Sequence, residues 1–147
     1  IANNEVMGLA KKIQSQATSN VSNVSQLAAE SALKNGLDVT KEMKIAFDRR
    51  RNYAIKKLES IDNLSVVNGT GAFYLYVDVN FYCTGKFLNI NSSEDFCNWL
   101  IENYFIAFVP GEVFGTNGFM RLSYALSDQE LEEGLERLAT AINDLNG

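Results

Sequence analysis

The sequence predicts an α+β fold in which a small, mostly antiparallel sheet is covered by helices and preceded by long N-terminal helices. Two observations predict it. Apolar residues recur at helical spacing through the first third of the chain, and then at the alternating spacing of strands. Helical spacing returns twice among the later strands, without the regular alternation of a parallel α/β sheet.

The composition fits one globular domain. The chain has 147 residues, of which 46% are hydrophobic and 21% charged, and no repeat or linker divides it. We therefore expect one domain over residues 1–147. The net charge of −5 disfavours nucleic acid as a partner, because phosphates select clustered lysines and arginines. No apolar run approaches the ~20 residues of a membrane helix, and none resembles a secretory signal, so we expect no membrane partner and a cytoplasmic setting.

The residue types exclude several kinds of chemistry. The chain has no histidine, which removes histidine-based triads and histidine-dependent zinc sites. Cys83 and Cys97 lack the spacing of metal ligands, so we expect no metal. The chain opens in a helical pattern without an initiator methionine or a leader, and we expect it to be a piece of a longer polypeptide.

The first part of the chain predicts three helices. Apolar spacing places the first over residues 5–16, and a polar stretch separates it from a second that stops at Gly36, an expected left-handed cap. Asp38 or Thr40 can cap the third helix. Three arginines at positions 49–51 lie between its apolar turns and are expected to form a solvated, ion-pairing face.

The second part predicts four strands and two helices. "LSVV" and "AFYLYVDVNF" are typical of strands, and the intervening "NGTG" favours a β-turn. Ser92 or Ser93 begins a helix, "FIAFVPGEVFG" is a short strand that runs into a loop at Pro110, and "GFMRLSYAL" is another strand. Ser127 and Glu130 form a capping box ahead of the last helix.

Arg121 is unusual because its neighbours are apolar. Strand alternation places Phe119, Arg121 and Ser123 on one side, with Met120 and the other even-numbered positions on the opposite side. A guanidinium taken out of water needs an anionic partner. The partner can be a carboxylate within the protein or the carboxylate of a ligand, and the residues alone favour neither.

Five segments occur in an order and at separations that resemble a known family: "KIQSQATSN" with the alanines after it, "FDRRR", "GAFYLYVDV", "VPGEVFG" and "MRLSYALSDQELEEGLERL". Together they resemble the C-terminal part of the class I, fold-type I pyridoxal-phosphate aminotransferases, in particular the bacterial aspartate aminotransferase subgroup. The resemblance covers essentially the whole chain. It implies that this chain is the small domain together with the end of the linking helices, and that the large cofactor-binding domain is absent from it.

The resemblance also implies roles for particular residues. Arg121 would bind the α-carboxylate of an amino-acid substrate, and Phe114 and Gly71 would border the substrate cleft. Ser19 and Asn20 match a segment near the cofactor phosphate of the neighbouring subunit. The family usually has proline where this chain has Val21, so the family's local backbone is not carried over to that position.

The family's Schiff-base lysine segment, of the form S-K-x-x-x-x-G-x-R, is missing from this sequence. The resemblance therefore implies no catalytic residue in this chain, no pyridoxal phosphate bound to it, and no activity of the chain alone. In the intact enzyme it implies the cofactor, amino-acid and 2-oxo-acid substrates, a homodimer, and aspartate as the donor. Aromatic amino acids, prephenate or a broader range of substrates stay open as alternatives. The alternative is a stand-alone, non-catalytic α+β module that binds an amino acid or a partner.

Overall fold

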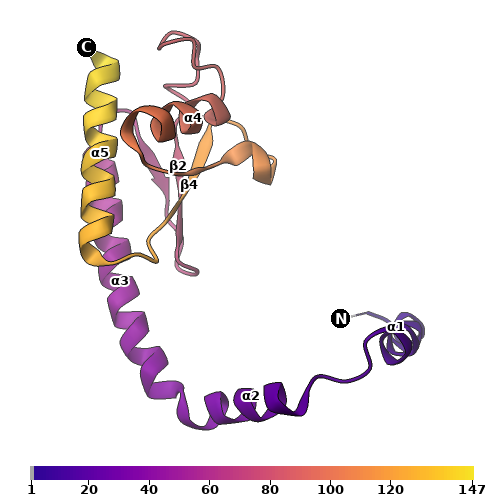
Figure 1. Cartoon of the computed structure of the whole chain (residues 1–147). Helices are drawn as coiled ribbons and strands as arrows, with labels where there is room; N and C mark the ends of the chain where they lie inside the picture. The colour runs from indigo at the N-terminus through magenta and orange to yellow at the C-terminus, as the bar shows by residue number, and fades with distance from the viewer. Residues whose placement is uncertain (1) are drawn as a thin grey trace. The chain divides into compact units, whose positions relative to one another are not determined.

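A computed structural model describes residues 2–147 and has the α+β architecture that the sequence predicts (Figure 1). By their internal contacts the residues divide into two units, Ile1–Glu42 and Met43–Gly147. None of the helices within residues 2–147 is long and apolar enough to cross a membrane. In chain order the elements are α1 (Asn4–Ala17), α2 (Asn23–Asn35), α3 (Leu37–Glu59), β1 (Ser65–Val67), β2 (Tyr74–Asp78), α4 (Ser93–Tyr104), β3 (Val109–Pro110), the 3₁₀ helix η1 (Gly111–Phe114), β4 (Phe119–Ser123) and α5 (Asp128–Asn146).

The first unit consists of α1, α2 and the start of α3, and neither α1 nor α2 contains a buried residue. The Asn3 side chain caps α1 by accepting a hydrogen bond from the Val6 amide at 2.9 Å. The predicted left-handed cap at Gly36 is wrong, because its φ is −90° and α3 follows at once. Neither Asp38 nor Thr40 caps α3. Both lie inside that helix, where the Thr40 hydroxyl donates to the Gly36 carbonyl at 3.0 Å.

The second unit is built on a four-stranded antiparallel sheet with the order β1-β2-β4-β3. One face of this sheet is buried, because alternate residues on β2 and β4 belong to the hydrophobic core. The same core contains residues from the C-terminal end of α3 and from α4 and α5. The predicted alternation on β4 is confirmed: the core side includes Leu75, Val77, Met120, Leu122 and Tyr124.

Local sequence signals define the two later helices. The Ser92 side chain accepts a hydrogen bond from the Asp95 amide at 3.0 Å, so Ser92 is the N-cap of α4. The predicted capping box of α5 is confirmed, since Ser127 and Glu130 satisfy one another's backbone amides. Phe96 and Leu100 on α4 are completely buried, and Tyr104 donates a hydrogen bond to Asp144 of α5.

The arginines of α3 form the predicted ion-pairing face. Arg49 and Arg50 both donate to Asp128, at 2.5 and 2.7 Å, and thereby connect α3 to the first turn of α5, which runs alongside it (Figure 1). Arg51 forms a longer ion pair with Asp48, at 3.6 Å, and donates to the Gly69 carbonyl. Arg50 and Arg51 are less solvated than predicted, because only 22% and 21% of their side chains are exposed.

Asp128 should make the stability of the fold depend on acid. Its pKa is lowered by the hydrogen bond from Arg50, with the charge of Arg49 adding to the effect. A carboxylate whose pKa is lowered in the folded state stabilises the fold at any pH above its ordinary pKa, about 3.9 for aspartate. This contribution is lost as the pH falls through the folded-state pKa. We expect the urea midpoint of Asp128→Asn to fall less than that of the wild type between about pH 5 and pH 3.

Asp62→Asn is the matched control for this experiment, because Asp62 is exposed and its side chain forms no ion pair within residues 2–147. Its acid dependence should follow that of the wild type. Equal slopes for Asp128→Asn and Asp62→Asn would contradict the assignment.

Candidate functional site

Arg121 lies at the middle of the sheet, on the face opposite the core. It pairs with Tyr76 of β2 on one side and Val109 of β3 on the other. Its side chain is half-buried. Strand geometry places Tyr74, Tyr76, Phe119 and Arg121 on this one face. The result is an aromatic surface with a single guanidinium in it.

Two aromatic rings contact the guanidinium of Arg121. Its central carbon lies 4.3 Å from the ring centre of Tyr74 and 4.7 Å from that of Phe114. Both distances are within the range of cation–π attraction, and Arg stacks on aromatic faces through its planar group. Neither ring accepts a conventional hydrogen bond, so the N–H groups of the guanidinium stay available as donors.

Arg121 has no acidic partner within residues 2–147. The arginines that form ion pairs or donate side-chain hydrogen bonds in this part of the chain are Arg49, Arg50 and Arg51. The internal salt bridge that the sequence left open is therefore not present in the described structure. A half-buried cation with free edge donors can bind a planar carboxylate through two parallel hydrogen bonds.

Phe114 reaches Arg121 because η1 folds tightly after β3. Pro110 precedes η1 in an extended conformation, and Gly115 ends it with a φ of 75°. The Phe114 ring also meets Tyr76 edge-on, at 6.4 Å between centres, while Tyr76 stacks on Phe119 at 5.1 Å. The structure thus brings together Arg121 and Phe114, two of the residues that the sequence singles out.

Gly111 allows the chain to approach itself at the start of η1. A Cβ atom there would lie 2.1 Å from the Thr116 carbonyl oxygen and 2.8 Å from that of Phe119. It would also lie 2.7 Å from the Tyr76 hydroxyl, which is enclosed without a hydrogen-bond partner among the described residues. Two of these neighbours are backbone atoms, so they cannot move aside without shifting η1.

Gly111→Ala should therefore destabilise the second unit, by about 1–3 kcal/mol or more, as overpacking does. Gly134→Ala is the matched control, because a Cβ on that residue of α5 would meet nothing within 4 Å. Alanine in a helix interior is favoured over glycine by about 0.5–1 kcal/mol, so the control should raise stability. Urea unfolding of both variants checks the prediction, and shifts of the same sign would contradict it.

The other predicted site residues lie apart from this cluster or in the other unit. Gly71 is exposed in the β1–β2 loop, and no backbone hydrogen bond among the described residues closes the "NGTG" segment, for which the sequence favours a β-turn. The Tyr124 hydroxyl donates to the Ala72 carbonyl and Arg51 donates to that of Gly69, which hold the loop in another way. Ser19 and Asn20 are exposed between α1 and α2, in the first unit, and Ser19 has a positive φ of 59°.

The cysteines offer no reactive thiolate. Burial raises the pKa of Cys83 to about 11 and that of Cys97 to about 12, so both thiols stay protonated at neutral pH. Both are free cysteines. Within residues 2–147, no three histidine, cysteine, aspartate or glutamate side chains are grouped as metal ligands would be.

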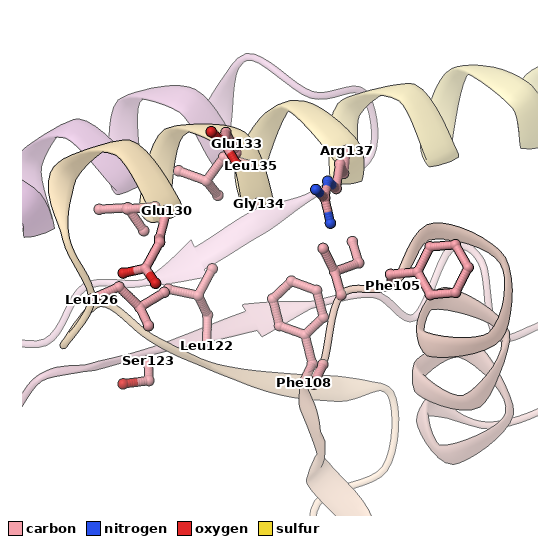
Figure 2. A pocket seen from close by; sticks show the side chains of 13 residues that line it. Phe105, Phe108, Leu122, Ser123, Leu126, Glu130, Glu133, Gly134, Leu135 and Arg137 are labelled. Atoms are coloured by element: carbon pink, nitrogen blue, oxygen red, sulfur yellow. The ribbon is translucent and has the colours of Figure 1, made fainter.

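A separate pocket of about 390 Å³ lies between α5 and the segment before β3 (Figure 2). Phe105 and Phe108 line it from that segment, and Arg137 and Glu130 line it from α5, whereas Arg121 does not line it. The sequence reasoning missed this pocket. No sequence motif marks it; in the structure Phe105 is 79% exposed and has a positive φ of 56°, unusual for a bulky residue.

Comparisons with known proteins agree with the sequence pattern. The family described as "Aminotransferase class I and II" matches residues 1–138. An aspartate aminotransferase of Rhizobium meliloti is 41% identical over 137 residues, which are 91% of this chain and 33% of that protein. A probable aspartate/prephenate aminotransferase of Aquifex aeolicus is 40% identical over 135 residues, 90% of this chain and 33% of the relative. The chain thus spans about a third of the length of the curated relatives it matches.

Solved structures show the same likeness. A crystal structure of the aspartate aminotransferase from Rhizobium meliloti matches with a TM-score of 0.84 and 38% identity, covering 96% of this chain and 36% of that one. A crystal structure of the aromatic aminotransferase from Pyrococcus horikoshii also has a TM-score of 0.84, at 29% identity, and covers 97% of this chain and 37% of that one. The arrangement of helices and strands described above is therefore shared with these proteins.

Proposed function

Because the chain belongs to the class I and II aminotransferases, we propose that it is the substrate-carboxylate-binding part of a pyridoxal-phosphate-dependent aminotransferase. The intact enzyme transfers an amino group from an L-amino acid to a 2-oxo acid, with aspartate as the donor. This donor is supported by the relatives, which are an aspartate aminotransferase and a probable aspartate/prephenate aminotransferase. The chain corresponds to the small domain, and the large cofactor-binding domain lies outside it.

One observation carries this proposal: Arg121 is a half-buried guanidinium without an acidic partner in the described structure, fixed between two rings. A bidentate bond to the α-carboxylate would fix the plane of that group and hence the direction of the amino group and the Cα–H bond. Arg121 is half-buried beside the two rings, and the lower local dielectric strengthens its hydrogen bonds. Arg121 thus binds and orients the substrate but moves no proton.

The cofactor needs residues beyond this site. When bound, pyridoxal phosphate supplies the electron sink for the chemistry at Cα. The aromatic cluster around Arg121 contains no lysine to hold it covalently, so these residues do not fit the cofactor and we assign no step through it to this chain. Gly71 borders the substrate cleft, and Ser19 and Asn20 contact the cofactor phosphate of the other subunit in a homodimer. The enzyme acts in the cytoplasm.

An assay of aminotransfer tests this function. The full-length protein that contains this chain, supplied with pyridoxal phosphate, should convert L-aspartate and 2-oxoglutarate to oxaloacetate and glutamate. The 147-residue chain alone should not, because the Schiff-base lysine segment is missing from its sequence. Absence of transfer by the full-length protein from aspartate and from aromatic amino acids, to 2-oxoglutarate and to prephenate alike, would contradict the proposal.

A further inference from the structure

The segment that carries Phe114 is attached to α4 through a second residue, Glu112. The Ser93 hydroxyl donates to Oε2 of Glu112 at 2.5 Å, and the Ser93 amide donates to Oε1 at 3.0 Å. Ser93 is the first residue of α4 and is completely buried. Both oxygens of the Glu112 carboxylate are therefore used, by two donors of the same residue.

The beginning of a helix suits a carboxylate. The first amides of a helix have no partner within it, and the helix dipole favours negative charge there. Ser92 satisfies the amide of Asp95, whereas Glu112 satisfies that of Ser93. Burial acts to raise the pKa of Glu112, but the hydrogen bond from the Ser93 hydroxyl and those from the backbone amides of Glu112, Ser93 and Glu94 together lower it. Glu112 is therefore ionised at neutral pH and remains an acceptor.

Within η1, Glu112, which tethers the segment to Ser93, lies two residues before Phe114, which carries the ring. Val113 between them is 67% exposed and does not anchor the segment, and Phe114 is itself 46% exposed. The backbone of η1 closes on itself, since the Gly115 amide donates to the Glu112 carbonyl at 3.0 Å. A side chain fixed at Glu112 thus limits where the Phe114 ring can lie.

We propose that Glu112 is a positioning residue, which holds η1 against the start of α4 and so keeps the Phe114 ring on the guanidinium of Arg121. The proposal rests on the function proposed for Arg121, because its consequence is weaker carboxylate binding. Without the tether, Arg121 keeps the contact with Tyr74, which is on β2, but loses the contact with the Phe114 ring. The guanidinium is then free to turn, and the orientation of its edge donors is lost.

The test uses the ¹H–¹⁵N spectrum of the 147-residue chain, in which rings close to Arg121 shift its Nε–H signal. Glu112→Ala should shift this signal in the same direction as Phe114→Ala does, and by most of the shift that Phe114→Ala causes. The double variant should move it no further than Phe114→Ala does, because both remove one contact. Succinate, used as a dicarboxylate probe at constant ionic strength, should bind the Glu112→Ala chain about 3–10-fold more weakly than the wild type, as expected from lost preorganisation.

Glu102→Ala is the matched control, because Glu102 is an exposed glutamate on α4, the helix that Glu112 contacts, and forms no ion pair within residues 2–147. It should leave the Arg121 signal unchanged. Glu112→Gln is used if the alanine variant does not fold, since its amide oxygen still accepts from the Ser93 amide. The shift of the Arg121 signal in Glu112→Gln should have the same sign and be smaller.

A Glu112 variant that lowers the melting temperature while the Arg121 signal stays at its wild-type position would overturn the proposal, because Glu112 would then be structural only. Failure of the function proposed for Arg121 looks different. Succinate would leave the wild-type Arg121 signal unmoved, while the signal would still respond to Glu112→Ala and Phe114→Ala in the absence of succinate.

Discussion

Replacing Arg121 by lysine in the full-length protein should lower kcat/KM for aspartate by about 100-fold or more, although the charge is kept. A hydrogen bond to a charged group contributes about 1.5–3 kcal/mol, which corresponds to roughly 10–100-fold in affinity. Lysine offers a point charge on a flexible stem and cannot form two parallel bonds in one plane. Misorientation of the bound substrate would reduce the rate further, by up to about 100-fold.

Steady-state kinetics with Arg121→Lys, Arg121→Ala and Arg137→Lys would check this expectation. Arg137 is an exposed arginine on α5 that lines the other pocket, so its replacement should leave the kinetics unchanged. Far-UV circular dichroism shows whether each variant is folded. An Arg121→Lys enzyme with the wild-type KM and kcat for aspartate would remove Arg121 from the substrate site.

The second large effect is expected in the hydrophobic core of the second unit, Met43–Gly147. Leu138 on α5 has no exposed surface, so Leu138→Ala should cost about 2–5 kcal/mol of unfolding free energy through lost burial and a cavity. That is a large part of the 5–15 kcal/mol typical of a domain. Urea unfolding at neutral pH measures the change.

Leu33→Ala is the control for this effect. Leu33 lies on α2 and is 77% exposed, and leucine and alanine both favour helices, so the change should stay within about 0.5 kcal/mol. If Leu33→Ala destabilised the chain as much as Leu138→Ala does, this would contradict the exposure of Leu33 on α2.

The order of elements could be predicted because it depends on short-range patterns. The alternation that puts Met120 and Leu122 in the core and Arg121 opposite them follows from strand geometry. The reciprocal bonds of Ser127 and Glu130 depend on residues three positions apart, which is a local feature. Both could therefore be predicted from sequence alone.

Features that depend on distant contacts could not be predicted. The ring of Tyr74 is 47 positions before Arg121 in the chain and meets it only because β2 pairs with β4. The bond between Ser93 and Glu112 joins residues 19 apart across two elements.

One local prediction was also wrong. Glycine often ends helices with a positive φ, which predicts such a φ at Gly36, but α3 begins at the next residue and the backbone stays right-handed.

The most direct measurement is a titration of the ¹⁵N-labelled chain with succinate at constant ionic strength, with the Arg121 Nε–H signal observed. Binding of a carboxylate at the edge of the guanidinium should shift this signal downfield along a saturable curve, and succinamide, which has no carboxylate, should not shift it. The exposed Arg137 should show no saturable shift. If the Arg121 signal shows no saturable shift either, and moves no more with succinate than the Arg137 signal does, then Arg121 is not a carboxylate-binding residue.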